Sequence, residues 1–171
     1  EKDIRFTMKS SPYGTVSHSH ADQNSFVIEA YGEPLAIPSG MYELYSSAHH
    51  HGWTRQTRAH NAVTFDGAGQ IVRSPEAVGS FPAFHTDDRF TYAMGDASPA
   101  YDERVASATR EVLVIDNTFF VMIDRFKLTY ETMWTWHLHA AKQITVDTDT
   151  RCAFLAYDIA AMDVVFCHRN D

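Results

Sequence analysis

The stretch that decides the fold is residues 112–124, VLVIDNTFFVMID. Two apolar runs, Val112–Ile115 and Thr118–Asp124, flank the pair Asp116-Asn117. Asp and Asn residues accept the positive φ angles that a primed hairpin turn requires. The stretch therefore predicts an antiparallel β-hairpin.

Short apolar runs of the same kind continue on both sides of this hairpin, with turn residues between them and no sustained helical period. Phe26–Ala30 and Pro34–Ile37 flank Tyr31-Gly32-Glu33, which predicts a second tight connection. Five further strands are expected at Ala62–Asp66, Thr132–Ala140, Ile144–Val146, Cys152–Tyr157 and Met162–Cys167. The last three complete a run of short strands at roughly ten-residue spacing, which is typical of a β-sandwich. We therefore predict an all-β, antiparallel β-sandwich fold and a single domain over residues 1–171.

The composition sets limits on partners. Hydrophobic residues make up 44% of the 171 residues, enough for one sizeable core, and their longest runs have the length of strands, so no membrane-spanning helix is expected. The net charge of −8 disfavours nucleic acid, because phosphate binding needs a basic face. It does not exclude an acidic sugar, since Ala48–His60 contains two arginines, four histidines and no acidic residue.

The first candidate for chemistry is Ser17–Asn24, SHSHADQN. His18 and His20 are two residues apart, so on an extended backbone both rings point to the same side. One ring could serve as an acid or base near neutral pH, while the other binds a metal or orients its neighbour. A polar turn that caps the following strand explains the motif about equally well.

The second candidate is His49–Asn61, HHHGWTRQTRAHN. Arginines make bidentate contacts with carboxylates, and Trp53 can cover the apolar face of a sugar. Taken alone, a solvated surface loop is the better explanation. The surrounding segment, Met41–Gln70, is expected to be a long loop that ends in the strand at Ala62–Asp66, and loops of this length are usually functional or mobile.

Two further features are left open. His137 and His139 share one face of the predicted strand Thr132–Ala140. They either line a cleft beside the first pair or are satisfied histidines of a sheet; the second interpretation is favoured for His139. Cys152 and Cys167 are expected to be buried core thiols rather than one disulfide.

Three blocks in a fixed order carry a resemblance to a known family: Ser11–Phe26 (SPYGTVSHSHADQNSF), Gly32–Ile37 (GEPLAI) and His50–Asn61 (HHGWTRQTRAHN). Together they resemble the heparinase II/III-like superfamily, which includes oligoalginate lyases and heparin or heparan sulfate lyases. The resemblance is close over Ser10–Gln70 and looser beyond it.

The resemblance implies a particular architecture and reaction. Members have an N-terminal α-helical toroid, absent here, followed by antiparallel β-domains, so this chain would be the β part of a longer protein. They cleave uronic-acid glycans by β-elimination in the cleft between the two parts. His18 matches the catalytic histidine of the β part. The motif blocks also supply the residues expected to bind substrate: Gln23, Asn24, His50, His51, Trp53, Arg55 and Arg58.

The resemblance also raises the question of zinc. His20 and His60 match zinc ligands of several members. The third ligand, an aspartate after the Gly-Glu-Pro-Leu strand, is replaced by Pro38, which has no side-chain donor. Either Asp22 substitutes for it, or the two imidazoles hydrogen-bond in a metal-free cleft.

The leading hypothesis is thus the β-domain of an exported bacterial lyase, periplasmic or secreted, acting on alginate-like or glycosaminoglycan-like polysaccharides. The isolated chain is expected to be inactive without the helical toroid. A non-catalytic carbohydrate-binding module is the alternative. A cupin-like metal oxygenase fits less well, because the glutamate expected shortly after His20 is missing and Glu29 is too distant.

Overall fold

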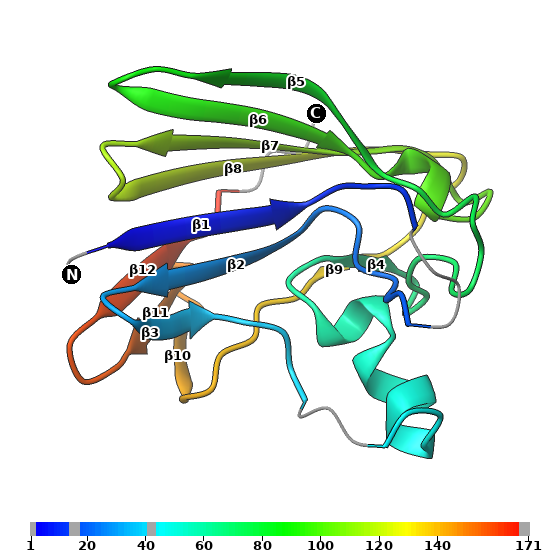
Figure 1. The fold of residues 1–171 in the computed structure, drawn as a ribbon, viewed down its shortest axis with the longest axis horizontal. Coiled ribbons are helices and arrows are strands. Elements are labelled where there is room, and N and C mark those ends of the chain that lie inside the picture. Colours follow the sequence, from blue (N-terminus) through cyan, green and yellow to red (C-terminus); the bar gives the residue numbers. More distant parts are fainter. Residues whose placement is uncertain (1–2, 14–17, 41–43, 168–171) are drawn as a thin grey trace.

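Figure 1 shows the computed structural model, which describes residues 3–13, 18–40 and 44–167. The described residues form an all-β structure in which every strand pair is antiparallel, as predicted. The strands are β1 (Ile4–Lys9), β2 (Ser25–Ala30), β3 (Glu33–Ala36), β4 (Val63–Phe65), β5 (Ser80–Thr86), β6 (Phe90–Asp96), β7 (Val105–Ile115), β8 (Phe119–Leu128), β9 (Trp134–Trp136), β10 (Ile144–Asp147), β11 (Cys152–Ala156) and β12 (Ala161–Val165). They are arranged as sheets β1-β2-β3, β4-β9, β5-β6-β7-β8 and β10-β11-β12.

The core lies between the four-stranded sheet and the sheet β1-β2-β3, which face each other in Figure 1. Phe26 and Ile28 of β2 are buried, and Phe120 and Met122 of β8 pack against them. The rings of Phe6 and Phe120 stack with centroids 5.4 Å apart, which joins the two layers. Alternate residues of each strand thus supply the core, the pattern expected for a sandwich.

Both predicted turns are confirmed. Asp116 and Asn117 have φ angles of 50° and 48°, and Tyr31 and Gly32 have φ angles of 57° and 86°. Ala30 pairs directly with Glu33 across the second turn. The hairpin at residues 112–124 is longer than its apolar runs indicate, because β7 already begins at Val105.

The predicted strand Thr132–Ala140 is wrong in length, since only Trp134–Trp136 form β9. Its partner β4 has three residues, so the ladder cannot continue. Beyond it, the N–H of His137 donates to the carbonyl of Ala62 and that of His139 to Oδ1 of Asn61. At His139, the side chain of Asn61 therefore accepts the hydrogen bond that a neighbouring strand would otherwise accept.

The segment Met41–Gln70, predicted as a long loop that ends in a strand, ends in β4 as predicted but contains two short helical turns; Met41–Glu43 lie outside the described residues. A π-helical turn η1 (His50–Thr54) and a 3-10 turn η2 (Thr57–Ala59) precede β4. The N–H of Ser39 donates to the carbonyl of Ala59 at 2.7 Å, which ties the segment to the end of β3. The histidine-rich segment is thus a structured unit.

Both cysteines are free thiols. Cys152 is half-buried at the start of β11, whereas Cys167 is exposed, so the prediction of a buried thiol is wrong for Cys167. Cys167 follows the end of β12. None of the helices among the described residues is long and apolar enough to cross a membrane.

Arg110 of β7 is the most connected charged side chain of the core. It is 2% exposed and lies directly opposite Asp124 of β8. Its Nε and Nη2 donate to the two carboxylate oxygens at 2.7 and 2.8 Å. Nη1 donates to the carbonyls of Asn24 at 2.6 Å and Asn61 at 3.0 Å, and the guanidinium lies over the ring of Phe26. One side chain therefore joins both histidine-containing segments to the four-stranded sheet.

We expect Arg110→Ala to lower the free energy of unfolding by about 3 to 5 kcal/mol, because it leaves the carboxylate of Asp124, which is only 15% exposed, without its cation. Urea denaturation measures the change. Arg125→Ala is the matched control: this exposed arginine pairs with Glu111 on the same two strands, and its loss should cost less than about 1 kcal/mol. Equal costs for the two variants would contradict the anchoring role of Arg110.

Candidate functional site

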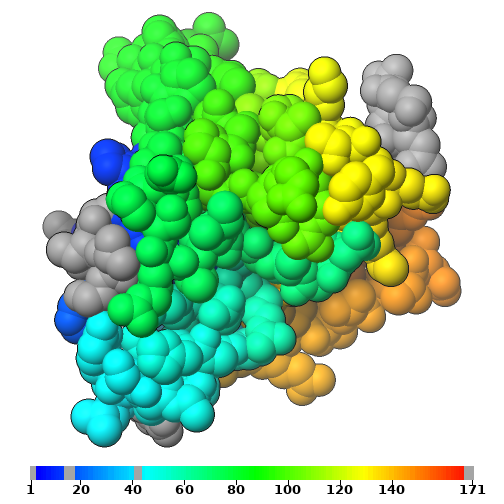
Figure 2. All heavy atoms as spheres, turned by 90° about the vertical axis from the view of Figure 1, so that its right-hand side faces the viewer, coloured from blue at the N-terminus to red at the C-terminus, as the bar shows by residue number. Residues whose placement is uncertain are grey.

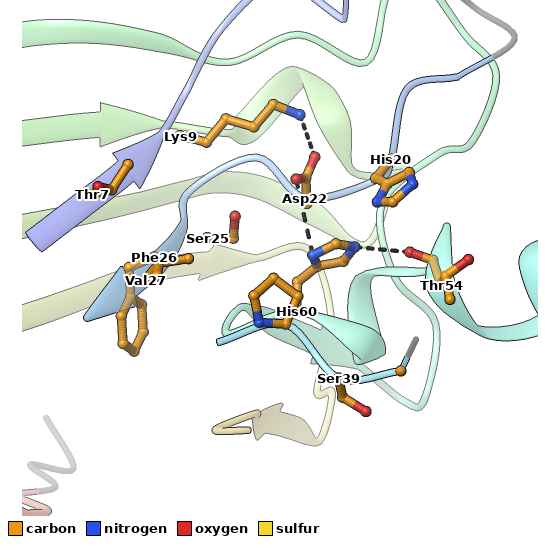
Figure 3. A pocket seen from close by; sticks show the side chains of 12 residues that line it. Thr7, Lys9, His20, Asp22, Ser25, Phe26, Val27, Ser39, Thr54 and His60 are labelled. Atoms are coloured by element: carbon orange, nitrogen blue, oxygen red, sulfur yellow. Dashed lines mark hydrogen bonds and ion pairs between the residues drawn. The ribbon is translucent and has the colours of Figure 1, made fainter. Parts of the chain in front are cut away.

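A pocket of about 300 Å³ lies where the end of β1 meets the two histidine-containing segments. Figure 3 shows it from close by. Its walls come from β1, the start of β2, the segment after β3 and the end of η1; the lining residues are Thr7, Lys9, His20, Asp22, Ser25, Phe26, Val27, Pro38, Ser39, Gly40, Thr54 and His60.

A chain of polar contacts crosses the pocket, drawn as dashed lines in Figure 3. The ammonium of Lys9 donates to Oδ1 of Asp22, and Oδ2 of Asp22 lies 4.0 Å from Nδ1 of His60. Nε2 of His60 is 3.1 Å from the carbonyl of Thr54. Because a carbonyl only accepts, Nε2 carries the proton, and Nδ1 of the neutral ring faces Asp22.

Aromatic contacts extend this arrangement into a cluster of rings. The centroid of His20 lies 5.2 Å from that of His60 and 6.4 Å from that of His50. Tyr45 joins His50 at 5.0 Å to His18 at 4.4 Å, where the two rings stack. The cluster brings together residues from the first and third sequence blocks, which are separated along the chain by β2 and β3.

The inner rings of the cluster are held in their neutral form. Burial lowers the pKa of His50, and the nearby Arg55 guanidinium acts in the same direction. Burial also lowers the pKa of His60 and of His20, against the opposing charge of Asp22. His18 lies at the exposed end of the cluster. Among the described residues, neutral imidazoles thus lie inside the cluster, with the exposed His18 at one end and the exposed His51 next to His50.

Some residues predicted to bind substrate are accessible. His51 and Arg58 are exposed, and Trp53 is half-buried. Cζ of Arg58 lies 5.3 Å from the centroid of the Trp53 ring, over its face. In Figure 2, the cyan segment that carries them forms the lower part of the face shown. These three side chains have the placement that the prediction requires.

The other predicted substrate-binding residues are buried: Gln23 and Arg55 and His50 at 1% exposed, and Asn24 at 7%. The amide of Gln23 exchanges hydrogen bonds with the backbone of Ser11 at 3.0 and 2.8 Å, and Asn24 donates to the carbonyl of Gly95 at 3.1 Å. Their burial argues against direct contact with a sugar. These residues were predicted to bind substrate because they lie within the motifs. In the structure, Gln23 and Asn24 stabilise the fold through these hydrogen bonds.

The residues that the structure describes do not fit a zinc ion. No group of three histidine, cysteine, aspartate or glutamate side chains among them is arranged as metal ligands. Pro38 lines the pocket without a donor, and the carboxylate of Asp22 is already paired with Lys9. The ammonium of Lys9, in hydrogen-bond contact with this carboxylate, repels a second cation such as zinc at the same group. Zinc binding at His20 and His60 stays a prediction from the resemblance.

Lys9, Thr54 and Tyr45 are site residues that sequence reasoning missed. Lys9 ends a strand that pairs with the start of β2, and its position opposite Ser25 follows from that register. No motif marks it. Arg110 did carry a signal, because a charged residue in an apolar strand with an acid across the hairpin indicates a buried ion pair.

Fold and site together define an antiparallel β-domain with an imidazole cluster at one end. The chain belongs to the heparinase II/III-like family, because the family model "Heparinase II/III-like, C-terminal" matches residues 1–171. The resemblance of the three sequence blocks is thereby confirmed.

Solved structures share the fold. A heparinase III with methylated lysines is 20% identical, with a TM-score of 0.77, over 91% of this chain and 23% of that one. A mutant of heparan sulfate lyase HepC from Pedobacter heparinus is 21% identical, with a TM-score of 0.73, over 90% of this chain and 24% of that one. The chain therefore spans about a quarter of the length of these structures. No curated protein matches the sequence.

The lowered pKa values of His20, His50 and His60 predict a loss of stability in mild acid. Below about pH 6.5 these histidines bind protons more readily in the unfolded chain than in the folded chain. The free energy of unfolding therefore falls as the pH falls. We expect a decrease of the melting temperature between pH 7.5 and 5.5.

His60→Gln should flatten this dependence, because glutamine does not titrate. His85→Gln is the control, since His85 is an exposed residue of β5. An unchanged slope in His60→Gln, or greater stability in acid, would contradict the assignment.

Proposed function

We propose that this chain is the β-domain of a polysaccharide lyase that cleaves uronic-acid-containing glycosaminoglycans by β-elimination, with His18 as its acid–base group. The observation that carries the proposal is the ring cluster, in which the exposed His18 is stacked on Tyr45 and leads to the pocket at His20. Membership of the heparinase II/III-like family supports the reaction class.

The chemistry of elimination suits this arrangement. A C5 proton beside a carboxylate anion is scarcely acidic, so donors or cations must hold the charge that develops. Imidazole near neutral pH can accept the C5 proton or protonate the departing glycosidic oxygen. The neutral rings of His20, His50 and His60 add no positive charge to the cluster behind His18. The exposed Arg58 and His51 of the segment His49–Asn61 are available as positive or hydrogen-bonding groups.

Two observations support the proposed substrate class: the charge of the segment His49–Asn61 and the similarity to solved structures. The His49–Asn61 segment is basic in a protein of net charge −8, which suits a polyanionic glycan. The similar structures are a heparinase III and a heparan sulfate lyase, which favours heparin-like chains over alginate. A bacterial periplasmic or secreted location is part of the same proposal, as is a helical toroid that supplies a tyrosine and an asparagine or histidine to the reaction.

His18→Ala in the longer protein should lower kcat by about 10²- to 10⁴-fold, the usual contribution of a positioned acid or base. Absorbance of the unsaturated uronate product reports turnover, and calorimetry reports binding. The 171-residue chain alone should show no turnover.

His85→Ala is the control, as it removes an exposed imidazole of β5. Full activity of His18→Ala would contradict the catalytic role. Retained glycan binding with no lyase activity in the unmodified protein would instead favour a non-catalytic binding module.

The Lys9–Asp22 pair predicts a pocket that works without zinc. We expect well under one zinc ion per chain by elemental analysis, and no change of melting temperature with a chelator. Lys9→Met should raise zinc affinity, because it releases the carboxylate beside His20 and His60. Stoichiometric zinc in the unmodified chain would contradict this account and support the ligand set that the resemblance implied.

A further inference from the structure

His137 and His139, which sequence analysis left open, form a pair of parallel rings. Their centroids are 6.1 Å apart and their planes differ by 5°. Nε2 of His139 donates to the carbonyl of Arg58 at 2.8 Å, and Nε2 of His137 lies 2.9 Å from Oγ1 of Thr64. Each ring is therefore fixed through Nε2. In the described part of the chain, no hydrogen-bond partner takes either Nδ1.

Arg58 and Trp53 extend this pair. The exposed guanidinium of Arg58 lies over the indole of Trp53, and Nη2 donates to the carbonyl of Gly52 at 2.7 Å. The edge of Trp53 faces His139 at 6.4 Å. These contacts hold the guanidinium in place. No other described group accepts from the hydrogens of Nε and Nη1 or from the second hydrogen of Nη2, which leaves two adjacent N–H groups for a bidentate ligand.

We name Trp53, Arg58, His137 and His139 the cationic–aromatic patch. No ion pair between described residues involves Arg58, His137 or His139. Burial lowers the pKa of His137, and the nearby His139 and Arg58 act in the same direction. Arg58 is thus a fixed cation that no acidic side chain among the described residues pairs with, in a protein of net charge −8. It creates a local positive potential.

The patch adjoins the pocket through one short segment. Pro38, Ser39 and Gly40 line the pocket, while Nε1 of Trp53 donates to Oγ of Ser39 at 3.1 Å. A Cβ at Gly40 would lie 2.8 Å from Cδ1 of Trp53, so the indole packs against the bare backbone there. The N–H of Ile37 donates to the carbonyl of His139 at 3.0 Å. A glycan that reaches the pocket can therefore continue onto the patch.

We propose that the cationic–aromatic patch is a second subsite, which binds an anionic sugar residue of the same glycan chain next to the pocket. The fixed guanidinium offers two N–H donors to a sulfate or carboxylate, the geometry in which arginine exceeds lysine. Trp53 orients the guanidinium and adds apolar area for the sugar ring. This inference rests on the proposed function, because it takes its ligand from the proposed glycosaminoglycan substrate.

Binding of two tetrasaccharides to the 171-residue chain tests the subsite: one heparin-derived and sulfated, and one of uronate residues without sulfate. Arg58→Ala should weaken binding about tenfold, which corresponds to about 1.4 kcal/mol. The affinity of Arg58→Lys should lie between those of the unmodified chain and Arg58→Ala, because lysine keeps the charge and loses the bidentate geometry. A loss confined to the sulfated ligand identifies sulfate as the anion, and equal losses identify the carboxylate.

Arg89→Ala is the matched control, as it removes an exposed arginine from the turn between β5 and β6, and it should bind like the unmodified chain. His139→Gln gives a second measure of the patch, and melting temperatures confirm that each variant folds. Unchanged affinity in both Arg58→Ala and His139→Gln overturns the inference, as does failure of both ligands to bind the unmodified chain.

The two proposals fail in different ways. Lyase activity that depends on His18, together with unchanged binding in Arg58→Ala, removes the subsite and leaves the proposed function. Binding that depends on Arg58 in a protein without lyase activity retains an anionic-sugar site and removes the catalytic proposal.

Discussion

The buried guanidinium of Arg110 is the constraint on which the rest of the structure depends. It pairs with Asp124 within the four-stranded sheet and also donates to the carbonyls of Asn24 and Asn61. Asn24 follows the His18–Asp22 motif closely, and Asn61 follows His60 directly. Asn61 adds a further link, since it donates to the carbonyl of Phe26 and accepts from the N–H of His139. An ion pair of the core thus sets where three histidine-bearing segments meet.

This arrangement separates the histidines by environment. Those near the core lie among buried side chains, where the neutral imidazole is favoured, while His18 and the cationic–aromatic patch face outward. Lys9 adds a fixed positive charge at Asp22. One acidic protein can therefore present an exposed imidazole and an exposed arginine at one end, and this is the surface on which the proposed glycan binding depends.

Sequence reasoning succeeded where the physics is local. Turn residues such as Asp116-Asn117 and Tyr31-Gly32 specify their own backbone angles, and strand spacing indicated the all-β class. The order of the three motif blocks indicated the family. Reasoning failed where the outcome depends on distant partners. The length of β9 is set by the short β4, and burial of Gln23 and Asn24 is set by Ser11 and Gly95. The approach of Lys9 to Asp22 follows from strand register, which no motif records.

Product analysis of a sulfated uronate glycan treated with the longer protein tests the central claim most directly. The account predicts that each cleavage yields one fragment with an unsaturated uronate at its new non-reducing end, lighter by one water than the corresponding hydrolysis product. Cleavage that yields saturated fragments only, or a glycan left intact by a correctly folded protein, would contradict elimination at this site.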